Sequence, residues 1–395
     1  MENPENSFNP GKIDNTQDTF SNRADINNAT TKQTAWTRRR FVVGAATLAG
    51  AVTLVGCGDE VGATPVATVN APVVPGLTKI TALAVVSSLN QKMDLRVGYM
   101  PYTDHITVPL VVGKIGKDFK FANVKAEQFQ KWVPGLDKLK AGQLDVMFTF
   151  VPPLFTRFGT EEIPAKVVLL AHRNGLYIFS KNGINKPQDL KGKIFAVPDK
   201  QSNYYVMAAK FLKQSGLTFD AGGDVKFVEY SLSDMGNALR NGDIDAFIQS
   251  GPASAVLEKQ GVGKILEYSA NFSPNHLDCV VLMRNEIIEK FPDVAQEFVT
   301  GTRKAISDFG LDQKNNKGAV DDKLKEAARI SAPFLNADMD SVYQALKQPD
   351  SAIIFSNPEP TLKDFQDLQA DWNKVVSIGN ATLNMANIIE TRFAK

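Results

Sequence analysis

The chain of 395 residues is 43% hydrophobic, so it can bury a large core in two domains or in one bilobed domain. Its 44 basic and 43 acidic residues leave a net charge of +1, which gives no electrostatic reason to expect a nucleic acid partner. The two cysteines, Cys57 and Cys279, exclude a disulfide framework and a four-cysteine zinc site.

The N-terminal region has the pattern of an export signal. Residues 1–56 begin with a polar segment that has no hydrophobic periodicity. A cationic cluster with Arg38 and Arg39 follows, and the apolar run at 41–55 is shorter than the roughly 20 residues that span a bilayer. This arrangement predicts a signal peptide, and the arginine cluster resembles a twin-arginine export motif.

The end of that apolar run predicts a lipid anchor. Residues 54–57 read L-V-G-C, which resembles a bacterial lipobox with Cys57 as the lipidated residue. Cys57 would become the mature N-terminus and hold the protein at the extracytoplasmic face of the cell membrane. The Gly-, Ala-, Thr-, Val- and Pro-rich stretch that follows suits an extended tether, which we place at 57–92.

A repeated unit organises the rest of the chain. Three residues of one segment recur one hundred positions later, and the pairs are Leu139 and Leu239, Gly142 and Gly242, and Asp145 and Asp245. Each copy predicts the end of a helix, a glycine with positive φ and a buried strand that opens with an aspartate. Because each aspartate starts its strand at the end away from the expected cleft, we expect it to bond nearby backbone or helix ends, not to catalyse a reaction.

The order of the elements predicts two similar α/β lobes. Strands alternate with helices in both copies, as in parallel βαβ units. We therefore expect lobe one at 93–180, lobe two at 181–276, and a return to lobe one followed by a helical region at 277–395. Within that last region, helices are predicted at 322–331, 338–347, 361–378 and 384–393.

Several segments resemble one family. D-L-K-G-K-I-F-A-V-P at 189–198 resembles the opening of the second lobe in type 2 periplasmic solute-binding proteins of ABC importers. The doubled aspartate unit, M-P-Y-T-D at 100–104 and N-H-L-D-C-V-V at 275–281 resemble its nitrate, sulfonate and bicarbonate-binding group. The resemblance implies a two-lobed fold with mainly parallel sheets flanked by helices. It also implies a monomeric receptor that closes on a small solute and delivers it to a membrane permease and its ATPase.

The expected binding residues follow from the fold. Strand ends and helix N-termini from both lobes face the cleft, and helix N-termini favour an anion. Lobe one offers Tyr102, Thr103, Asp104, His105, Lys131, Trp132 and Thr149, and lobe two offers Lys200, Gln201, Ser202, Asn203, Ser231, Gln249 and Ser250. Lys131 and Lys200 are the expected anion-binding cations. Asp104 opposes an anion, so we expect it to cap the following helix or to pair with a lysine or arginine.

The sequence gives little support to other functions. His105, His276 and Cys279 lack the spacing of a metal site, so neither a metal nor a cofactor is expected and Cys279 is interpreted as a buried apolar residue. No nucleophile elbow, phosphate loop or zinc-protease motif is present. A sensor or structural lipoprotein remains an alternative, as does a pyrimidine-forming enzyme on the same scaffold, although the latter family uses a cysteine-rich motif.

Overall fold

The computed structural model describes residues 91–393, apart from 152–153, 155–162, 201, 220, 313–318, 348–352, 356–357 and 376–384. The predicted signal peptide with Arg38 and Arg39, the lipidation site Cys57 and almost all of the tether lie outside these residues. In the described part of the chain, no helix combines the length and the apolar composition that crossing a membrane requires.

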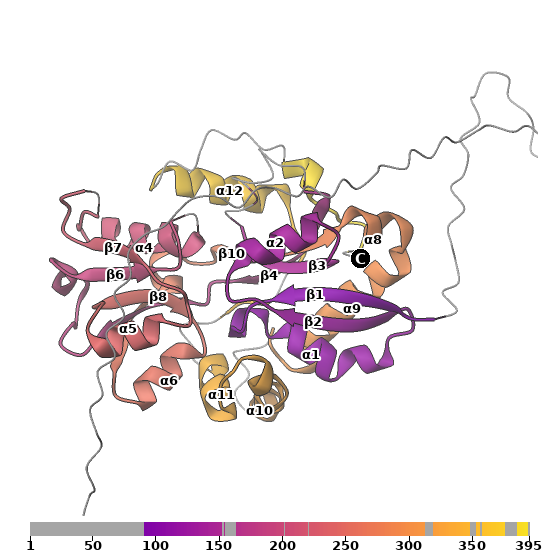
Figure 1. Ribbon diagram of the computed structural model, residues 1–395, viewed down its shortest axis with the longest axis horizontal. Coiled ribbons are helices and arrows are strands. Elements are labelled where there is room, and N and C mark those ends of the chain that lie inside the picture. The colour runs from indigo at the N-terminus through magenta and orange to yellow at the C-terminus, as the bar shows by residue number, and fades with distance from the viewer. Residues whose placement is uncertain are drawn as a thin grey trace, which may run out of the picture. The chain divides into compact units, whose positions relative to one another are not determined.

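The body is built from two five-stranded sheets with helices around them (Figure 1). The first sheet has the order β2 (Ala122–Gln128), β1 (Met93–Tyr99), β3 (Val146–Phe150), β10 (Leu277–Arg284) and β4 (Ala165–Arg173). The second has the order β7 (Lys226–Glu229), β6 (Ile194–Val197), β8 (Ala246–Ser250), β5 (Leu176–Lys181) and β9 (Gly263–Tyr268). The predicted α/β class is therefore confirmed.

The two sheets repeat one pattern of strand directions. In each, the second strand pairs in parallel with both of its neighbours: β1 with β2 and β3, and β6 with β7 and β8. In each, the fourth strand is antiparallel to both of its neighbours, and these strands are β10 and β5. The repeated sequence unit thus marks a repeated βαβ architecture, to which one antiparallel strand is added per lobe.

Helices cover the sheets of both lobes. Those that follow lobe-one strands are α1 (Thr107–Gly113), α2 (Trp132–Lys140), α8 (Asn285–Lys290) and α9 (Pro292–Asp308), and those of lobe two are α4 (Asn203–Gln214), α5 (Met235–Asn241), α6 (Ala253–Lys259) and the single turn α7 (Ser269–Phe272). The helix α4 buries one face that includes Val206, Met207 and Phe211. This face explains its stability, because an amphipathic helix gains most of its stability from packing.

The first crossing between the lobes lies earlier than expected. Lobe one was predicted to extend to residue 180, but β5 pairs with β8 and β9 in the second sheet. The chain therefore crosses at Asn174 and Gly175, which both have positive φ. The apolar pattern at 177–180 predicts a buried strand but does not indicate which sheet the strand joins. This is why the lobe boundary was predicted too late in the chain.

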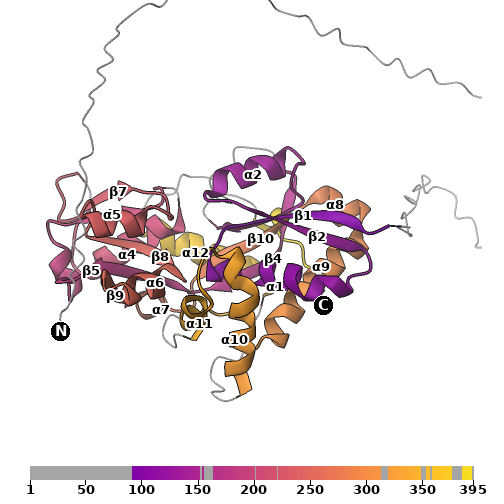
Figure 2. The same ribbon diagram turned by 60° about the horizontal axis from the view of Figure 1, so that its bottom comes forward.

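The C-terminal region joins the two lobes. It contains α10 (Ala319–Ser331), α11 (Met339–Lys347) and α12 (Leu362–Asn373). Figures 1 and 2 show α11 and α12 on opposite sides of the junction between the sheets. In place of the predicted helix at 384–393, Met385–Ile388 form a 3-10 turn and Ile389 makes a bridge to Val167 of β4. Pairing of Ile389 with the edge strand β4 thus replaces the predicted helix at this position.

The matched aspartates have the structural role that the sequence predicts. Asp145 accepts hydrogen bonds from the backbone N–H of Arg96 at 3.0 Å and from its guanidinium at 2.7 and 2.8 Å. Asp245 accepts from the backbone N–H of Ile194 at 2.8 Å and pairs with Lys181. Gly142 and Gly242 have φ of 72° and 83°. Each unit therefore attaches the start of one strand to the neighbouring parallel strand.

Replacing Asp145 with asparagine should destabilise the fold more than the same change at Asp245. The Asp145 side chain is 1% exposed and also pairs with Arg284, whereas that of Asp245 is 14% exposed. We expect losses of about 2 kcal/mol for Asp145→Asn and about 1 kcal/mol for Asp245→Asn, because a more buried charge pair costs more to break. Urea unfolding of both variants measures the difference, and equal losses would contradict this account.

Candidate functional site

The two lobes touch through a few specific contacts. The backbone N–H of Thr103 donates to the carbonyl of Gly251 at 2.9 Å. The indole N–H of Trp132 donates to Asp199 at 2.9 Å, and the rings of Phe150 and Tyr204 meet edge to face at 4.8 Å. These contacts join the segment after β1, the start of α2 and the end of β3 to two loops and the start of α4 in lobe two, so the two lobes are in contact in this structure.

The closed lobes bury a large set of polar side chains. All of them are buried, and the set comprises Tyr102, Thr103, Asp104, His105, Thr149, His172, Asn174, Tyr177, Asn203, Tyr204, Gln249, Ser250, Ser254 and Asp278. Among the described residues, the side-chain atoms of several of them have no hydrogen-bond partner, including Thr103, Thr149 and both polar atoms of Asn203. Unsatisfied buried polar groups are costly, and they gather at sites that bind something.

Part of this set is acidic and lies at the two crossings of the chain. His172 is the penultimate residue of β4, and its Nε2 lies 3.6 Å from Asp104 Oδ2 and 3.5 Å from Asp278 Oδ2. Cys279 Sγ lies 4.0 Å from Asp278 Oδ2. Asp104 comes from the 3-10 turn Thr103–His105 after β1, and Asp278 and Cys279 come from β10. We call His172, Asp278, Cys279 and Asp104 the acidic cluster.

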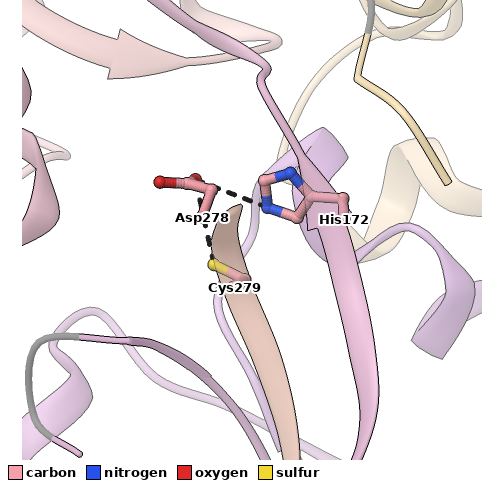
Figure 3. Close-up of side chains that lie close together, drawn as sticks. All are labelled: His172, Asp278 and Cys279. Atoms are coloured by element: carbon pink, nitrogen blue, oxygen red, sulfur yellow. Dashed lines mark hydrogen bonds and ion pairs between the residues drawn. The ribbon is translucent and has the colours of Figure 1, made fainter. Parts of the chain in front are cut away.

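A β-bulge explains how two adjacent residues of one strand reach the same histidine. Side chains alternate between faces in a regular strand, so Asp278 and Cys279 would point in opposite directions. Cys279 lies opposite His172, and the register of β10 against β4 shifts on both sides of Cys279. A bulge re-aims side chains in this way. Figure 3 shows the carboxylate, the thiol and the imidazole close together.

Burial sets the charges of the acidic cluster. It raises the pKa of Asp278, and the neighbouring Asp104 raises it further. The pKa of the Cys279 thiol is raised by burial and then by Asp278, while burial lowers the pKa of His172. All three pKa shifts follow mainly from the cost of placing a charge in a low-dielectric interior. Without a compensating cation, neutral forms of these groups are therefore favoured.

A cavity of about 360 Å³ adjoins the buried set. Lobe one contributes Pro101, Tyr102 and Gln130, lobe two contributes α5, α6 and Gln249, and residues 335–337 complete the wall. Tyr102 and Gln249 belong both to this cavity and to the buried set. The cavity volume lies within the range of small-molecule sites.

The predicted site residues divide into buried and exposed groups. Tyr102, Thr103, Asp104, His105, Trp132, Thr149, Ser202, Asn203, Gln249 and Ser250 are all buried. Ser202 caps α4, as expected, by accepting from the N–H of Tyr205 at 3.2 Å. Ser231 is partly exposed and bonds Ser233 and Asp234. Gln201 lies outside the described residues.

The two expected anion-binding cations do not join the buried set. Lys131 and Lys200 are exposed, and no lysine or arginine is buried anywhere in the described ranges. They flank Trp132 and Asp199, whose contact closes the lobes over the site. Sequence position correctly put them on cleft loops, but it did not show that Trp132 turns inward while its neighbour stays in solvent.

One of the two roles predicted for Asp104, capping of the following helix, is not observed. No side chain caps α1, which follows Ile106. Asp104 instead lies beside His172, a residue that sequence reasoning did not select. His172 and Asp278 were missed because they lie at crossings of the chain, and a crossing has no local sequence signature. The sequence offered one indication: His172 is one of only three histidines in the chain and follows an apolar run.

The fold agrees with that of known proteins. A family model described as NMT1-like matches residues 89–320. The chain belongs to the NMT1-like family. The taurine-binding periplasmic protein of Escherichia coli K12 is 28% identical over 226 residues, which cover 56% of this chain and 68% of that protein.

Two solved structures share the periplasmic binding protein fold of this chain. The ligand-binding component of an ABC-type import system from Staphylococcus aureus, solved with zinc bound, has a TM-score of 0.65 and 20% identity and covers 77% of this chain and 98% of its own. The periplasmic nitrate-binding protein NrtA of Synechocystis PCC 6803 also has a TM-score of 0.65, with 14% identity, over 77% of this chain and 87% of its own.

A side chain at Gly251 should keep the lobes from closing. A Cβ added there would lie 2.8 Å from Thr103 Oγ1 and 2.8 Å from the Cβ of Ala345 in α11. Atoms cannot approach so closely without a shift, so Gly251→Ala should favour a more open form with a larger radius of gyration in small-angle X-ray scattering.

The matched control for this prediction removes the two obstructing groups. Thr103→Ala and Ala345→Gly, combined with Gly251→Ala, should restore the compact scattering profile. If Gly251→Ala alone were as compact as the parent protein, Gly251 would not limit closure.

Proposed function

We propose that the protein is the extracytoplasmic solute-binding component of an ABC importer, anchored to the membrane by a lipid on Cys57. Membership of the NMT1-like family, the periplasmic binding protein fold and the names of the relatives support this function. The single observation that carries it is a set of buried polar side chains next to the contacts between the lobes, in which Thr103, Thr149 and Asn203 have side-chain atoms without a hydrogen-bond partner among the described residues. A receptor of this kind captures its solute by hinge closure and presents the closed form to a permease.

The proposed solute is a small anion of the nitrate, sulfonate or bicarbonate type. The N-terminus of α4 supports an anionic ligand, because its first-turn N–H groups and the helix dipole favour negative charge. Asn203 adds an amide with two unpartnered atoms at the same helix end, and Thr149 adds a hydroxyl from the opposite lobe. Charge-assisted hydrogen bonds from such donors contribute about 1.5–3 kcal/mol each.

Asn203→Ala should weaken solute binding much more than the loss of either exposed lysine. Removing a buried amide that bonds a charged ligand costs about 1.5 kcal/mol or more, which corresponds to about a tenfold weaker affinity. Lys131→Ala and Lys200→Ala should change the affinity by less than about threefold, because exposed charges contribute little.

Isothermal titration with nitrate, bicarbonate, taurine and an alkanesulfonate measures these effects. If none of the four bound the parent protein, the proposed solute class would be wrong. If one bound and only the lysine variants lost affinity, the exposed rim, not the buried set, would hold the solute.

Cys57→Ser should release the protein from the membrane. A lipid anchor depends on acyl chains carried by this cysteine, since a hydrophilic tether alone gives no membrane affinity. After cell fractionation, the parent protein should sediment with membranes and the variant should remain in the soluble extracytoplasmic fraction. Cys279→Ser is the matched control, because Cys279 is buried and should not affect fractionation. Membrane association of Cys57→Ser would contradict the anchor.

A further inference from the structure

The acidic cluster is unusual for a site that receives an anion. Two carboxylates, a thiol and an imidazole are each at most 1% exposed and lie together at the crossings of the chain. Within the described part of the molecule, both ring nitrogens of His172 lack a hydrogen-bond partner. The same holds for Oδ1 of Asp278. Buried polar atoms without partners are costly, so a ligand that bonded these groups would stabilise the cluster.

We propose that the acidic cluster binds a divalent transition metal ion through His172, Asp278, Cys279 and Asp104. Imidazole, thiolate and carboxylate together are the donors of zinc and of similar borderline-soft metals. Ca²⁺ and Mg²⁺ prefer oxygen donors alone and suit this set less well. The site stands on its own residues and does not depend on the solute that the cleft receives.

The two distances from the imidazole of His172 match those around one tetrahedral ion, and the thiol of Cys279 lies slightly farther away. With metal–nitrogen and metal–oxygen bonds near 2.1 Å and a metal–sulfur bond near 2.3 Å, tetrahedral ligand atoms lie about 3.4 to 3.6 Å apart. His172 Nε2 lies 3.5 Å from Asp278 Oδ2 and 3.6 Å from Asp104 Oδ2, and Cys279 Sγ lies 4.0 Å from Asp278 Oδ2. The ligand atoms of His172, Asp278 and Cys279 all lie within 4.8 Å of one another (Figure 3). Only small side-chain movements are needed to close the set on an ion.

The local fold supports this assignment independently. The bulge at Cys279 breaks the regular alternation of β10 and turns two successive side chains towards one point. A strand that served only the core would have no reason to place a carboxylate and a thiol together against a histidine. The bulge is therefore the feature that places Asp278 and Cys279 of β10 together beside His172 of β4.

A bound metal would also change what the cleft can accept. Two buried carboxylates repel an anion, whereas a divalent ion would neutralise them and supply positive charge that the buried set otherwise lacks. The site faces lobe two, because Tyr204 follows Asn203 at the start of α4 and packs on Phe150, the neighbour of Cys279 in β3. Solute and metal would thus share one chamber.

Cobalt binding tests the proposal with a signal that reports the ligands. The full chain is used in a Cys57→Ser background, so that Cys279 is the only thiol. After chelator treatment and dialysis, titration with Co²⁺ in the absence of solute should give one ion per chain and a thiolate-to-cobalt charge-transfer band in the near ultraviolet. Zn²⁺ should displace Co²⁺ and abolish the band.

The variants separate the ligands from the surrounding fold. Cys279→Ser, a nearly isosteric change, should abolish the charge-transfer band, and His172→Ala and Asp278→Ala should weaken Co²⁺ binding at least tenfold. His276→Asn is the control, because His276 is equally a buried histidine but bonds the carbonyl of Ser273. It should retain both the band and the affinity, and circular dichroism checks the fold of every variant.

Three results would overturn the metal site. They are a parent protein without the band, a band that persists in Cys279→Ser, and a loss in His276→Asn as large as that in His172→Ala. Because no solute is present in these titrations, failure of the solute experiment leaves them unaffected. Repeating the solute titration with metal-free and Zn²⁺-loaded protein then shows whether the ion strengthens anion binding.

Discussion

The two crossings of the chain are the constraint on which the rest of this structure depends. After β4 the chain enters the second sheet as β5, and after β9 it returns to the first sheet as β10. Each crossing strand lies antiparallel between two neighbours, so it cannot shift without breaking hydrogen bonds on both of its edges. The crossings therefore fix the lobes at one end and leave closure to the loops and the C-terminal helices.

The same crossings explain why the unsatisfied polar groups lie where they do. His172 lies just before the first crossing, Asn174 lies within it, and Asp278 and Cys279 follow the second crossing, so residues far apart in sequence meet beside the crossings. From lobe two, Tyr204 of α4 packs on Phe150 of β3, which lies opposite Cys279. The site consequently combines a rigid part that belongs to the hinge with a movable part that belongs to lobe two.

The sequence predicted the architecture better than the chemistry. The doubled Leu–Gly–Asp unit indicated two βαβ lobes, because helix ends, positive-φ glycines and buried strands have strong local signatures, and most cleft loops followed from it. The crossing at Asn174, the bulge at Cys279 and the contact of His172 with Asp104 arise from strand pairing across long separations, for which no local pattern exists. Lys131 and Lys200 were correctly predicted to lie on loops, but the sequence did not show that their side chains are exposed while that of Trp132 is buried.

The bond from Trp132 to Asp199 has a practical consequence. Trp132 is one of three tryptophans in the chain, it is buried, and its indole bonds Asp199 of the opposite lobe. Opening would transfer its indole to water and away from a quenching carboxylate, while the buried Trp372 stays within α12. The emission of Trp132 is thus a built-in optical reporter of hinge motion, so ligand screening of this protein requires no attached dye.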